Sequence, residues 1–148
     1  MHTEILEFRQ GEFIISTDPA RLDLAEIHDY LSNYSYWVPG IPFPQVELAA
    51  EHSLNFGMYY QGRQIGYARV LTDYIRFAYL MDVFVLEEFR GRGLGKWLIE
   101  CVTRYPALQN VRRWMLATWD AHELYGRFGF EPLARPDRFM EKVSKKTT

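Results

Sequence analysis

The sequence predicts a mixed α/β fold, in which a mostly antiparallel central sheet is flanked by helices on both faces. Segments with strand-like and helix-like periodicity alternate along the chain. Apolar residues make up 48% and charged residues 24% of the 148 positions, as in ordinary globular proteins. A glycine-rich turn also joins one predicted strand directly to an amphipathic helix. The expected order is β-α-α-β-β-β-α-β-α-β, in a single domain over residues 1–148 with residues 145–148 frayed.

The first half of the chain is predicted to hold one strand, two helices and an aromatic loop. The strand covers residues 12–16, and Asp18 with Pro19 begins a helix over 20–33. Residues 34–44 contain three prolines and cannot continue that helix, because proline lacks the amide donor. A second helix is expected over 44–52.

The second half is predicted to alternate strands and helices. Strands over 54–60 and 64–71 flank a turn at Gly62, and a third strand covers 78–86. An apolar stripe from Leu94 to Tyr105 predicts an amphipathic helix that ends near Pro106. A strand over 113–118 precedes a short helix capped by Asp120, and a last strand is expected over 139–143.

Composition and charge exclude several classes of protein. The net charge of −2 argues against a dedicated binder of nucleic acid or anionic membranes. A single cysteine, Cys101, excludes an internal disulfide, and the four histidines lack metal-ligand spacing, so no metal is expected. No apolar run approaches the ~20 residues of a membrane span, and the first residues do not resemble a secretory signal. We therefore expect a cytoplasmic protein.

The sharpest local feature is the turn between the strand over 78–86 and the following helix. Gly91, Gly93 and Gly95 remove side chains where a ligand must approach the backbone, and the first helical amides have no intrahelical partner. The helix dipole favours negative charge there, and Arg90, Arg92 and Lys96 add positive charge. The sequence therefore predicts an anion site, most simply for phosphates.

Known glycine-rich motifs of different types fit this turn less well. A Walker-A loop needs Ser or Thr after Gly-Lys, but Trp97 follows Lys96. A Rossmann fingerprint needs different glycine spacing and a later acidic residue. An arginine-glycine nucleic-acid patch would be isolated in a net-negative chain, and glycines used only for a tight turn are the simplest alternative.

The turn resembles a known signature. Arg90-Gly91-Arg92-Gly93-Leu94-Gly95 resembles the Arg/Gln-x-x-Gly-x-Gly/Ala motif of the GNAT superfamily of N-acetyltransferases, and residues 82–85 resemble the strand that precedes it there. Residues 124–130 resemble the family's second motif, Leu-Tyr-x-x-x-Gly-Phe. The resemblance covers residues 54–130 well, whereas residues 1–53 match only in element order. It implies an acyl-CoA N-acyltransferase-like fold.

The resemblance implies acetyl-CoA as the acyl donor. The pyrophosphate would lie on the amides of the glycine turn, and the pantetheine arm would pair with the preceding strand like an added strand. The implied cofactor residues are Val83, Phe84, Val85, Arg90, Gly91, Arg92, Gly93, Leu94, Gly95, Lys96 and Tyr125.

The same resemblance implies a direct transfer with Tyr125 as the general acid. A phenol can protonate the thiolate that leaves, although Tyr125 would also suit a core position on an apolar helix face. The general base is either Asp82 or His122, because Met81 stands where some polyamine-acetylating relatives carry the glutamate that serves as their base. Asp82 is expected to point to the strand face opposite Met81, and His122 has the alternative of being a solvated first-turn residue. Cys101 is expected to be buried and inert rather than a nucleophile.

The acceptor site is predicted from residues on the open side of the fold. Tyr36 and Trp37 in the aromatic loop are the first candidates, and Asp73 and Tyr74 the second. The function expected is acetyl transfer to the amine of a small molecule. A protein lysine or N-terminal acetyltransferase and a non-catalytic acyl-CoA sensor remain alternatives, and the many aromatic residues leave room for a homodimer surface.

Overall fold

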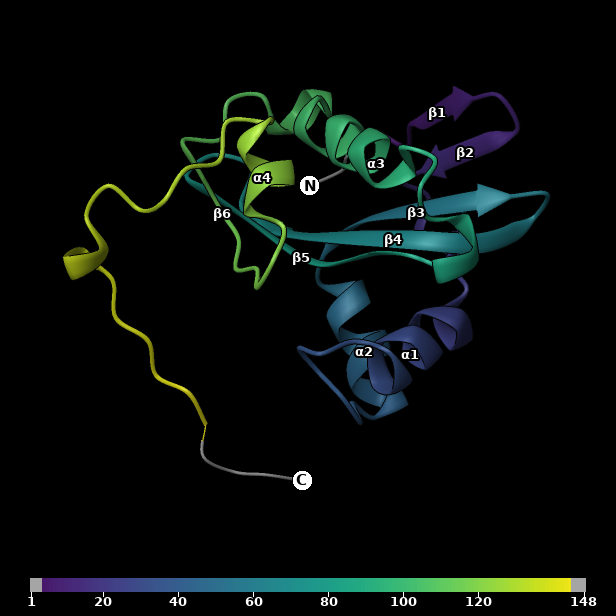
Figure 1. The fold of residues 1–148 in the computed structure, drawn as a ribbon, viewed down its shortest axis with the longest axis horizontal. Helices are drawn as coiled ribbons and strands as arrows, with labels where there is room; N and C mark the ends of the chain where they lie inside the picture. Colours follow the sequence, from purple (N-terminus) through teal and green to yellow (C-terminus); the bar gives the residue numbers. More distant parts are fainter. Residues whose placement is uncertain (1–3, 145–148) are drawn as a thin grey trace.

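A six-stranded sheet with helices on both faces forms the body of the protein (Figure 1). The computed structural model describes residues 4–144. The strands follow one another across the sheet in chain order: β1 (Glu7–Gln10), β2 (Phe13–Ser16), β3 (Leu54–Tyr60), β4 (Arg63–Thr72), β5 (Phe77–Val85) and β6 (Arg113–Met115). The helices are α1 (Leu24–Asn33), α2 (Phe43–Glu51), α3 (Leu94–Thr103) and α4 (His122–Gly126).

The sheet is antiparallel except at one place. Each strand from β1 to β5 runs antiparallel to the next, whereas β5 and β6 are parallel and pair only from Phe77 with Arg113 to Tyr79 with Met115. The crossover between them contains α3, as a parallel connection requires. The predicted fold class is therefore confirmed.

Two apolar cores lie on opposite faces of the sheet. The helices α1 and α2 cover one face, where Ile27 and Val46 pack with Tyr67 and Phe84 of the strands. On the other face α3 packs its stripe against the sheet, with Leu98, Ile99 and Val102 fully buried. That stripe matches the predicted periodicity, so the helix forms where burial of one face stabilises it.

Several predicted elements need correction. The strand over 12–16 is real as β2, but it pairs with an unpredicted strand, β1, across a turn in which Gly11 has φ +59°. The helix expected over 20–33 is divided into a 3-10 turn at Pro19–Arg21 and α1, which begins after its own cap, Asp23. The strand expected over 113–118 ends at Met115.

Two predictions near the C-terminus are wrong. Residues 139–143 form no strand, because nothing in the described chain pairs with them. Asp120 does not cap α4: Ala121 occupies the cap position, and its N–H donates instead to Thr118 Oγ1 at 3.1 Å. The frayed end expected over residues 145–148 lies outside the described residues.

A β-bulge interrupts β5 close to its middle. Tyr67 of β4 pairs with Phe84, but Arg69 pairs with Met81, so β5 carries one extra residue between these points. Asp82 in the bulge has φ +53°, a left-handed conformation in which Asp is tolerated better than most residues. The bulge therefore re-aims the side chains that follow it.

Candidate functional site

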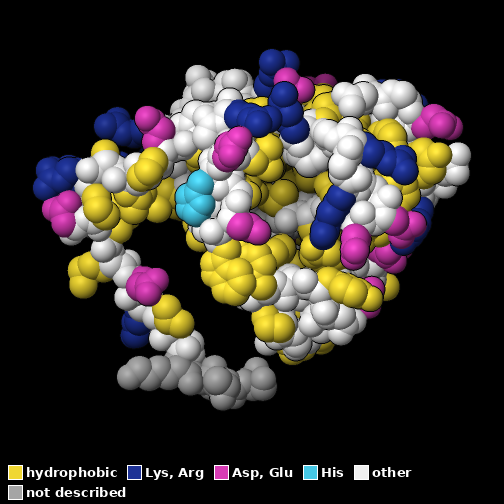
Figure 2. Space-filling view, in the orientation of Figure 1, with side chains coloured by type: hydrophobic (Ala, Val, Ile, Leu, Met, Phe, Trp, Pro, Cys, Tyr) yellow, Lys and Arg dark blue, Asp and Glu magenta, His cyan; other side chains and the backbone are white. Residues whose placement is uncertain are grey.

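The divergence of β5 from β6 opens a cavity at the centre of the molecule. Its volume is about 560 Å³, and apolar side chains gather around the hollow on the face that Figure 2 shows. Its wall comes from α1, α2, the aromatic loop between them, β4, β5, the segment after β6 and α4. Its lining includes Tyr36, Trp37, Arg69, Tyr79, Met81, Asp82, Val83, Thr118, Trp119, Asp120 and Tyr125.

Tyr125 stands at the wall of this cavity on α4. It is only 9% exposed, and its ring makes an edge contact with Phe130 at 5.9 Å. Burial raises the pKa of Tyr125 to about 12, with smaller contributions from Tyr36 and the Asp120 carboxylate. The phenol therefore keeps its proton at neutral pH and can act as a hydrogen-bond donor.

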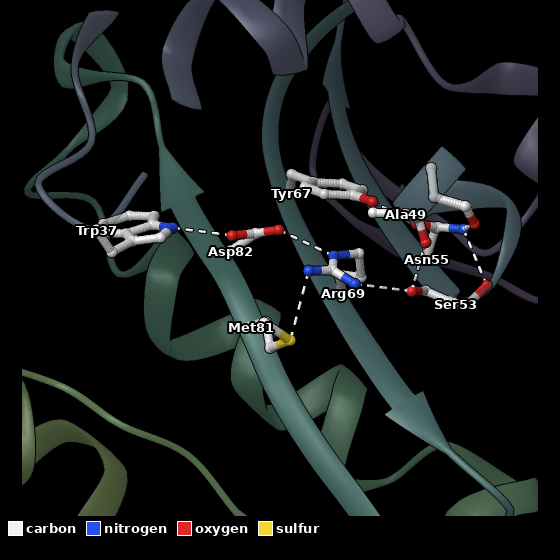
Figure 3. Close-up of polar contacts among 9 residues, drawn as sticks. Trp37, Ala49, Ser53, Asn55, Tyr67, Arg69, Met81 and Asp82 are labelled. Carbon is white, nitrogen blue, oxygen red and sulfur yellow. Dashed lines mark hydrogen bonds and ion pairs between the residues drawn. The ribbon is translucent and has the colours of Figure 1, made fainter. Parts of the chain in front are cut away.

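Asp82 lies at the centre of a network that links the aromatic loop to the sheet (Figure 3). Trp37 Nε1 donates to Oδ1 of Asp82 at 2.8 Å, and Arg69 Nε donates to Oδ2 at 2.9 Å. Both charged side chains are about nine-tenths buried, at 11% exposure for Arg69 and 9% for Asp82. A buried carboxylate with two such donors is held firmly in one orientation.

Arg69 carries the network further into the sheet. Its Nη1 donates to Ser53 Oγ at 3.0 Å, and its Nη2 lies 3.4 Å from the sulfur of Met81. Met81 and Asp82 therefore both reach Arg69, although strict alternation predicts opposite faces. The bulge explains the difference, because the extra residue breaks the two-residue period at this point.

The aromatic loop contributes a stacked pair of rings to the cavity wall. The ring centroids of Tyr36 and Trp119 lie 4.1 Å apart, and the angle between the ring planes is 10°. The Tyr36 hydroxyl also accepts a hydrogen bond from the backbone N–H of Trp119 at 3.1 Å. Tyr36 also meets Trp37 edge-on at 4.9 Å. The predicted residues Tyr36 and Trp37 are thus brought together, with Trp119 as an unpredicted third member.

The glycine turn leaves bare backbone at the N-terminus of α3. Gly91 and Gly93 have φ of +81° and +76°, conformations that glycine adopts without strain. Gly95 has no such φ, and a Cβ built there would meet nothing within 4 Å, so neither conformation nor internal packing requires glycine. Within residues 4–144, the N–H groups of Leu94, Gly95 and Lys96 have no hydrogen-bond acceptor. These amides suit an anion.

The positive side chains of the turn lie in different places. Arg90 points inward, since its Nε donates to the Val85 carbonyl at 3.0 Å and its Nη2 to the Tyr30 hydroxyl at 2.9 Å. It therefore fixes the turn to β5 and α1. The guanidinium of Arg92 lies over the Phe89 ring at 5.5 Å.

The C-terminal end of β5 presents main-chain groups toward the space between β5 and β6, where the two strands no longer pair. Leu86 N donates to Ile65 O of β4 at 2.8 Å. The main-chain N–H and C=O groups of neighbouring residues in a strand point to alternate edges. Those of Val83 and Val85 therefore point toward the side of β6. No described residue pairs with β5 on that side beyond Tyr79. This edge connects the cavity to the glycine turn.

The remaining predicted residues lie away from the cavity. His122 lines a second cavity on the outer side of β6. The Asp73 carboxylate accepts from the N–H groups of Ile75, Arg76 and Phe77, which lowers its pKa, and neither Asp73 nor Tyr74 lines the central cavity. Among the described residues, no group of three metal-ligating side chains occurs, and no helix has the length and apolarity to cross a membrane.

Sequence reasoning missed two important residues of the cavity. Arg69 had a visible signal, since a cation inside an otherwise apolar strand needs a buried partner. Trp119 had none, because nothing local indicates that it meets a loop some eighty residues earlier.

A model of the Acetyltransferase (GNAT) family matches residues 24–130, which include the central cavity, the bulge and the glycine turn. The chain belongs to the GNAT family of acetyltransferases. The resemblance inferred from the two motifs is therefore confirmed, and the protein is an acyltransferase.

Relatives of this GNAT protein agree in sequence and structure. A crystal structure from Xanthomonas campestris pv. campestris, assigned to the GNAT family, is 47% identical with a TM-score of 0.88, covering 92% of this chain and 96% of that one. A Gibberella zeae protein inferred to be an acetyltransferase is 31% identical, over 84% of this chain and 82% of its own length. The aminoglycoside N-acetyltransferase AAC(6')-Iy, solved with CoA, shares the fold with a TM-score of 0.66 at 22% identity, covering 93% of this chain and 98% of that one.

Proposed function

We propose that this GNAT enzyme transfers an acetyl group from acetyl-CoA directly to the amine of a small molecule. One observation carries the proposal: the free edge of β5 runs from the unsatisfied amides of the glycine turn to the cavity that holds the protonated phenol of Tyr125. A phosphate-binding end and an acid are thus joined by a strand edge that can pair with an amide-bearing chain.

The donor would lie along this edge. The pyrophosphate would accept from the N–H groups of Leu94, Gly95 and Lys96, with Gly91, Arg92 and Gly93 shaping the turn. The pantetheine arm would pair with the main chain of Val83 and Val85, while Phe84 packs into the core beside Tyr30. Arg90 holds the turn in place, since it is bonded to Val85 O and the Tyr30 hydroxyl.

The chemistry needs one acid and one route for a proton. The neutral amine attacks the thioester carbonyl, the carbon–sulfur bond breaks, and the departing sulfur takes the proton of the Tyr125 phenol. The attacking nitrogen loses one proton, which reaches Asp82 through water and returns to the phenol by solvent. Asp82 is the better candidate for the proton acceptor, because it lines the same cavity as Tyr125. His122 lines the second cavity instead.

The acceptor would occupy the central cavity, beside the Tyr36–Trp119 stack. A volume of about 560 Å³ suits a small molecule, and the aromatic walls suit an apolar body that carries the amine. The cavity's charged pair, Arg69 and Asp82, is neutral overall, and Asp120 adds one carboxylate to the lining. This arrangement favours an acceptor without a large net charge.

Binding of CoA is tested first, with two variants of Gly95. CoA at about 100 times its Kd should stabilise the protein by ~2.7 kcal/mol. Gly95→Glu places an acid at a helix N-terminus, which favours the helix but opposes a phosphate, so thermal stability should hold while the CoA effect disappears. Gly95→Ala is the matched control and should keep the effect. Equal responses of both variants would remove the pyrophosphate from this turn.

Turnover is tested by an amine panel that follows release of the CoA thiol. Small aromatic and alkyl amines should be acetylated faster than lysine-containing peptides. Preferential turnover of peptides would instead identify a protein acetyltransferase. Binding of CoA without turnover of any acceptor would identify an acyl-CoA sensor.

A further inference from the structure

One charge in the lining of the central cavity has no partner. Three charged residues line this cavity: Arg69 and Asp82 form an ion pair with each other, and Asp120 is the third. Across the part of the chain that the structure describes, the Asp120 carboxylate takes part in no hydrogen bond and no ion pair. Asp120 does not cap α4 either, because Ala121 occupies that position. The local fold therefore makes no use of this carboxylate.

Aromatic rings accompany Asp120 in the cavity wall. Its neighbour Trp119 is 74% exposed, and the Trp119 ring stacks on that of Tyr36, which is 41% exposed. The stacked pair lines the cavity and leaves much of its ring surface open to a ligand. A carboxylate together with aromatic rings attracts an organic cation, because the negative charge and the negative ring faces act in the same direction.

Asp120 also lies near the phenol of Tyr125. Burial is the main cause of the raised pKa of Tyr125, and Tyr36 and the Asp120 carboxylate add smaller contributions. A carboxylate raises the pKa of another acid in this way only when the two groups are close. A cation bound at Asp120 would therefore lie at the end of the cavity that holds the phenol.

We infer that Asp120 and the Tyr36–Trp119 stack bind the acceptor amine in its ammonium form. The inference rests on the proposed acetyl transfer, and it narrows the acceptor class to aliphatic amines with one positive charge, since these are protonated at neutral pH and arylamines are not. One positive charge matches the one uncompensated negative charge of the lining. Asp82 suits this role less well, because the guanidinium of Arg69 already balances its charge (Figure 3).

Asp120 acts in binding and not as the proton acceptor. The ammonium proton must pass to water before the nitrogen can attack, so a carboxylate that stabilises the ammonium ion stabilises the bound acceptor and not the transition state. Loss of this carboxylate should raise KM and leave kcat almost unchanged. Loss of a proton acceptor would lower kcat instead.

The first test measures binding without reaction. Choline and 3,3-dimethylbutan-1-ol serve as probes, because they have nearly the same shape, only choline is charged, and neither has an N–H group to acetylate. The natural protein should bind choline about tenfold more tightly than the neutral analogue. Asp120→Asn should remove this preference by weakening the binding of choline alone. Ligand-observed NMR measures both affinities, and circular dichroism checks that the variant is folded.

Glu123→Gln is the matched control. It removes the same charge three residues further along the chain, from a side chain that is ion-paired with Arg127 and lines neither cavity. This variant should keep the preference for choline. Steady-state kinetics with the fastest alkyl amine of the panel gives a second readout, in which Asp120→Asn should raise KM about tenfold and change kcat by less than about twofold.

Four outcomes would overturn the inference. Equal binding of choline and its neutral analogue by the natural protein would exclude a cation site, and a preference that survives Asp120→Asn would place the site elsewhere. Loss of the preference in Glu123→Gln would indicate a general effect of net charge. A fall in kcat at constant KM in Asp120→Asn would make Asp120 the proton acceptor. Because the probes require no acyl donor, choline binding by a protein that acetylates no amine would contradict the proposed function and not the cation site.

Discussion

The rings of Tyr36 and Trp119 stack at 4.1 Å and join the aromatic loop to the segment that follows β6. These two parts of the chain meet at the central cavity, and the stacked pair forms part of its wall. Because Trp119 is 74% exposed, its role in the stability of the fold is small. The pair therefore offers a way to alter the cavity without unfolding the protein.

We predict that Trp119→Ala raises the KM for the acceptor by about threefold to tenfold, since an aromatic pair contributes ~0.5–1.5 kcal/mol beyond its burial. The Kd for CoA should stay the same, and the melting temperature should fall by a few degrees at most, because the stacking energy that is lost is small. Steady-state kinetics with each substrate varied in turn makes the measurement. Trp119→Phe keeps a ring in the stack and serves as the control, and an equal KM for both variants would contradict a role for the stack.

Tyr125→Phe should lower kcat by about 10²-fold, in the range of a positioned acid. The ring and its contact with Phe130 remain, so CoA binding and thermal stability should change little. Thiol release under saturating substrates measures kcat, and calorimetry measures CoA binding. A variant with the natural kcat would exclude the phenol from the proton transfer.

Asp82→Asn should lower the free energy of unfolding by ~3 kcal/mol, because it leaves the buried guanidinium of Arg69 without its carboxylate. Asn tolerates the left-handed backbone at this position and can still accept from Trp37. Urea denaturation gives the value. The double variant Arg69→Met/Asp82→Asn removes both charges and should recover much of the loss; no recovery would mean that the pair is not energetically coupled.

Cys101 should react with alkylating reagents only when the protein unfolds. Burial raises the pKa of its thiol to about 12, so almost no thiolate is present at neutral pH. Cys101→Ala should keep its kcat, as direct transfer requires no enzyme thiol. Mass spectrometry after timed alkylation tests the first point, and an acetylated Cys101 after incubation with acetyl-CoA would argue for a covalent intermediate.

Stability should fall at alkaline pH between about 10 and 12. Burial raises the pKa of Tyr59 and of Tyr125 to about 12, while an unfolded tyrosine titrates near 10. The unfolded state then binds fewer protons than the folded state, so the free energy of unfolding decreases as pH rises through this window and is unaffected by these groups below it. Urea midpoints across the range measure the slope. Tyr59→Phe should make the slope shallower, because Tyr125 and the buried Tyr67, whose pKa is also raised, still contribute. An unchanged slope would contradict the assignment.

The sequence predicts well those elements whose cause is local. The helix α3 follows from its apolar stripe, and the unsatisfied amides of its first turn follow from its position directly after the glycine turn. Strand β1 was missed because its short, polar sequence gives no signal apart from its partner β2. The predicted strand at 139–143 was wrong for the opposite reason: the local pattern is suitable, but a strand needs a neighbour, and none is present in the described chain.

The candidate site divides in the same way. Tyr125 and the glycine turn were found because each belongs to a continuous motif. The contacts of Trp37 with Asp82 and of Tyr36 with Trp119 join residues far apart in the chain, and only the folded structure brings them together. The bulge at Asp82 was also invisible, since an extra residue in a strand depends on the pairing with β4 rather than on composition.

The bulge at Asp82 makes β5 intolerant of insertions and deletions. Deleting one residue near position 82 would restore the regular period of β5, exchange the faces of the residues that follow, and turn the main-chain groups of Val83 and Val85 away from the gap. Substitutions there can be absorbed one at a time, but a change of length cannot. We therefore expect homologues that retain acyl transfer to vary in side chain around this position while keeping the same number of residues between Arg69 and the glycine turn.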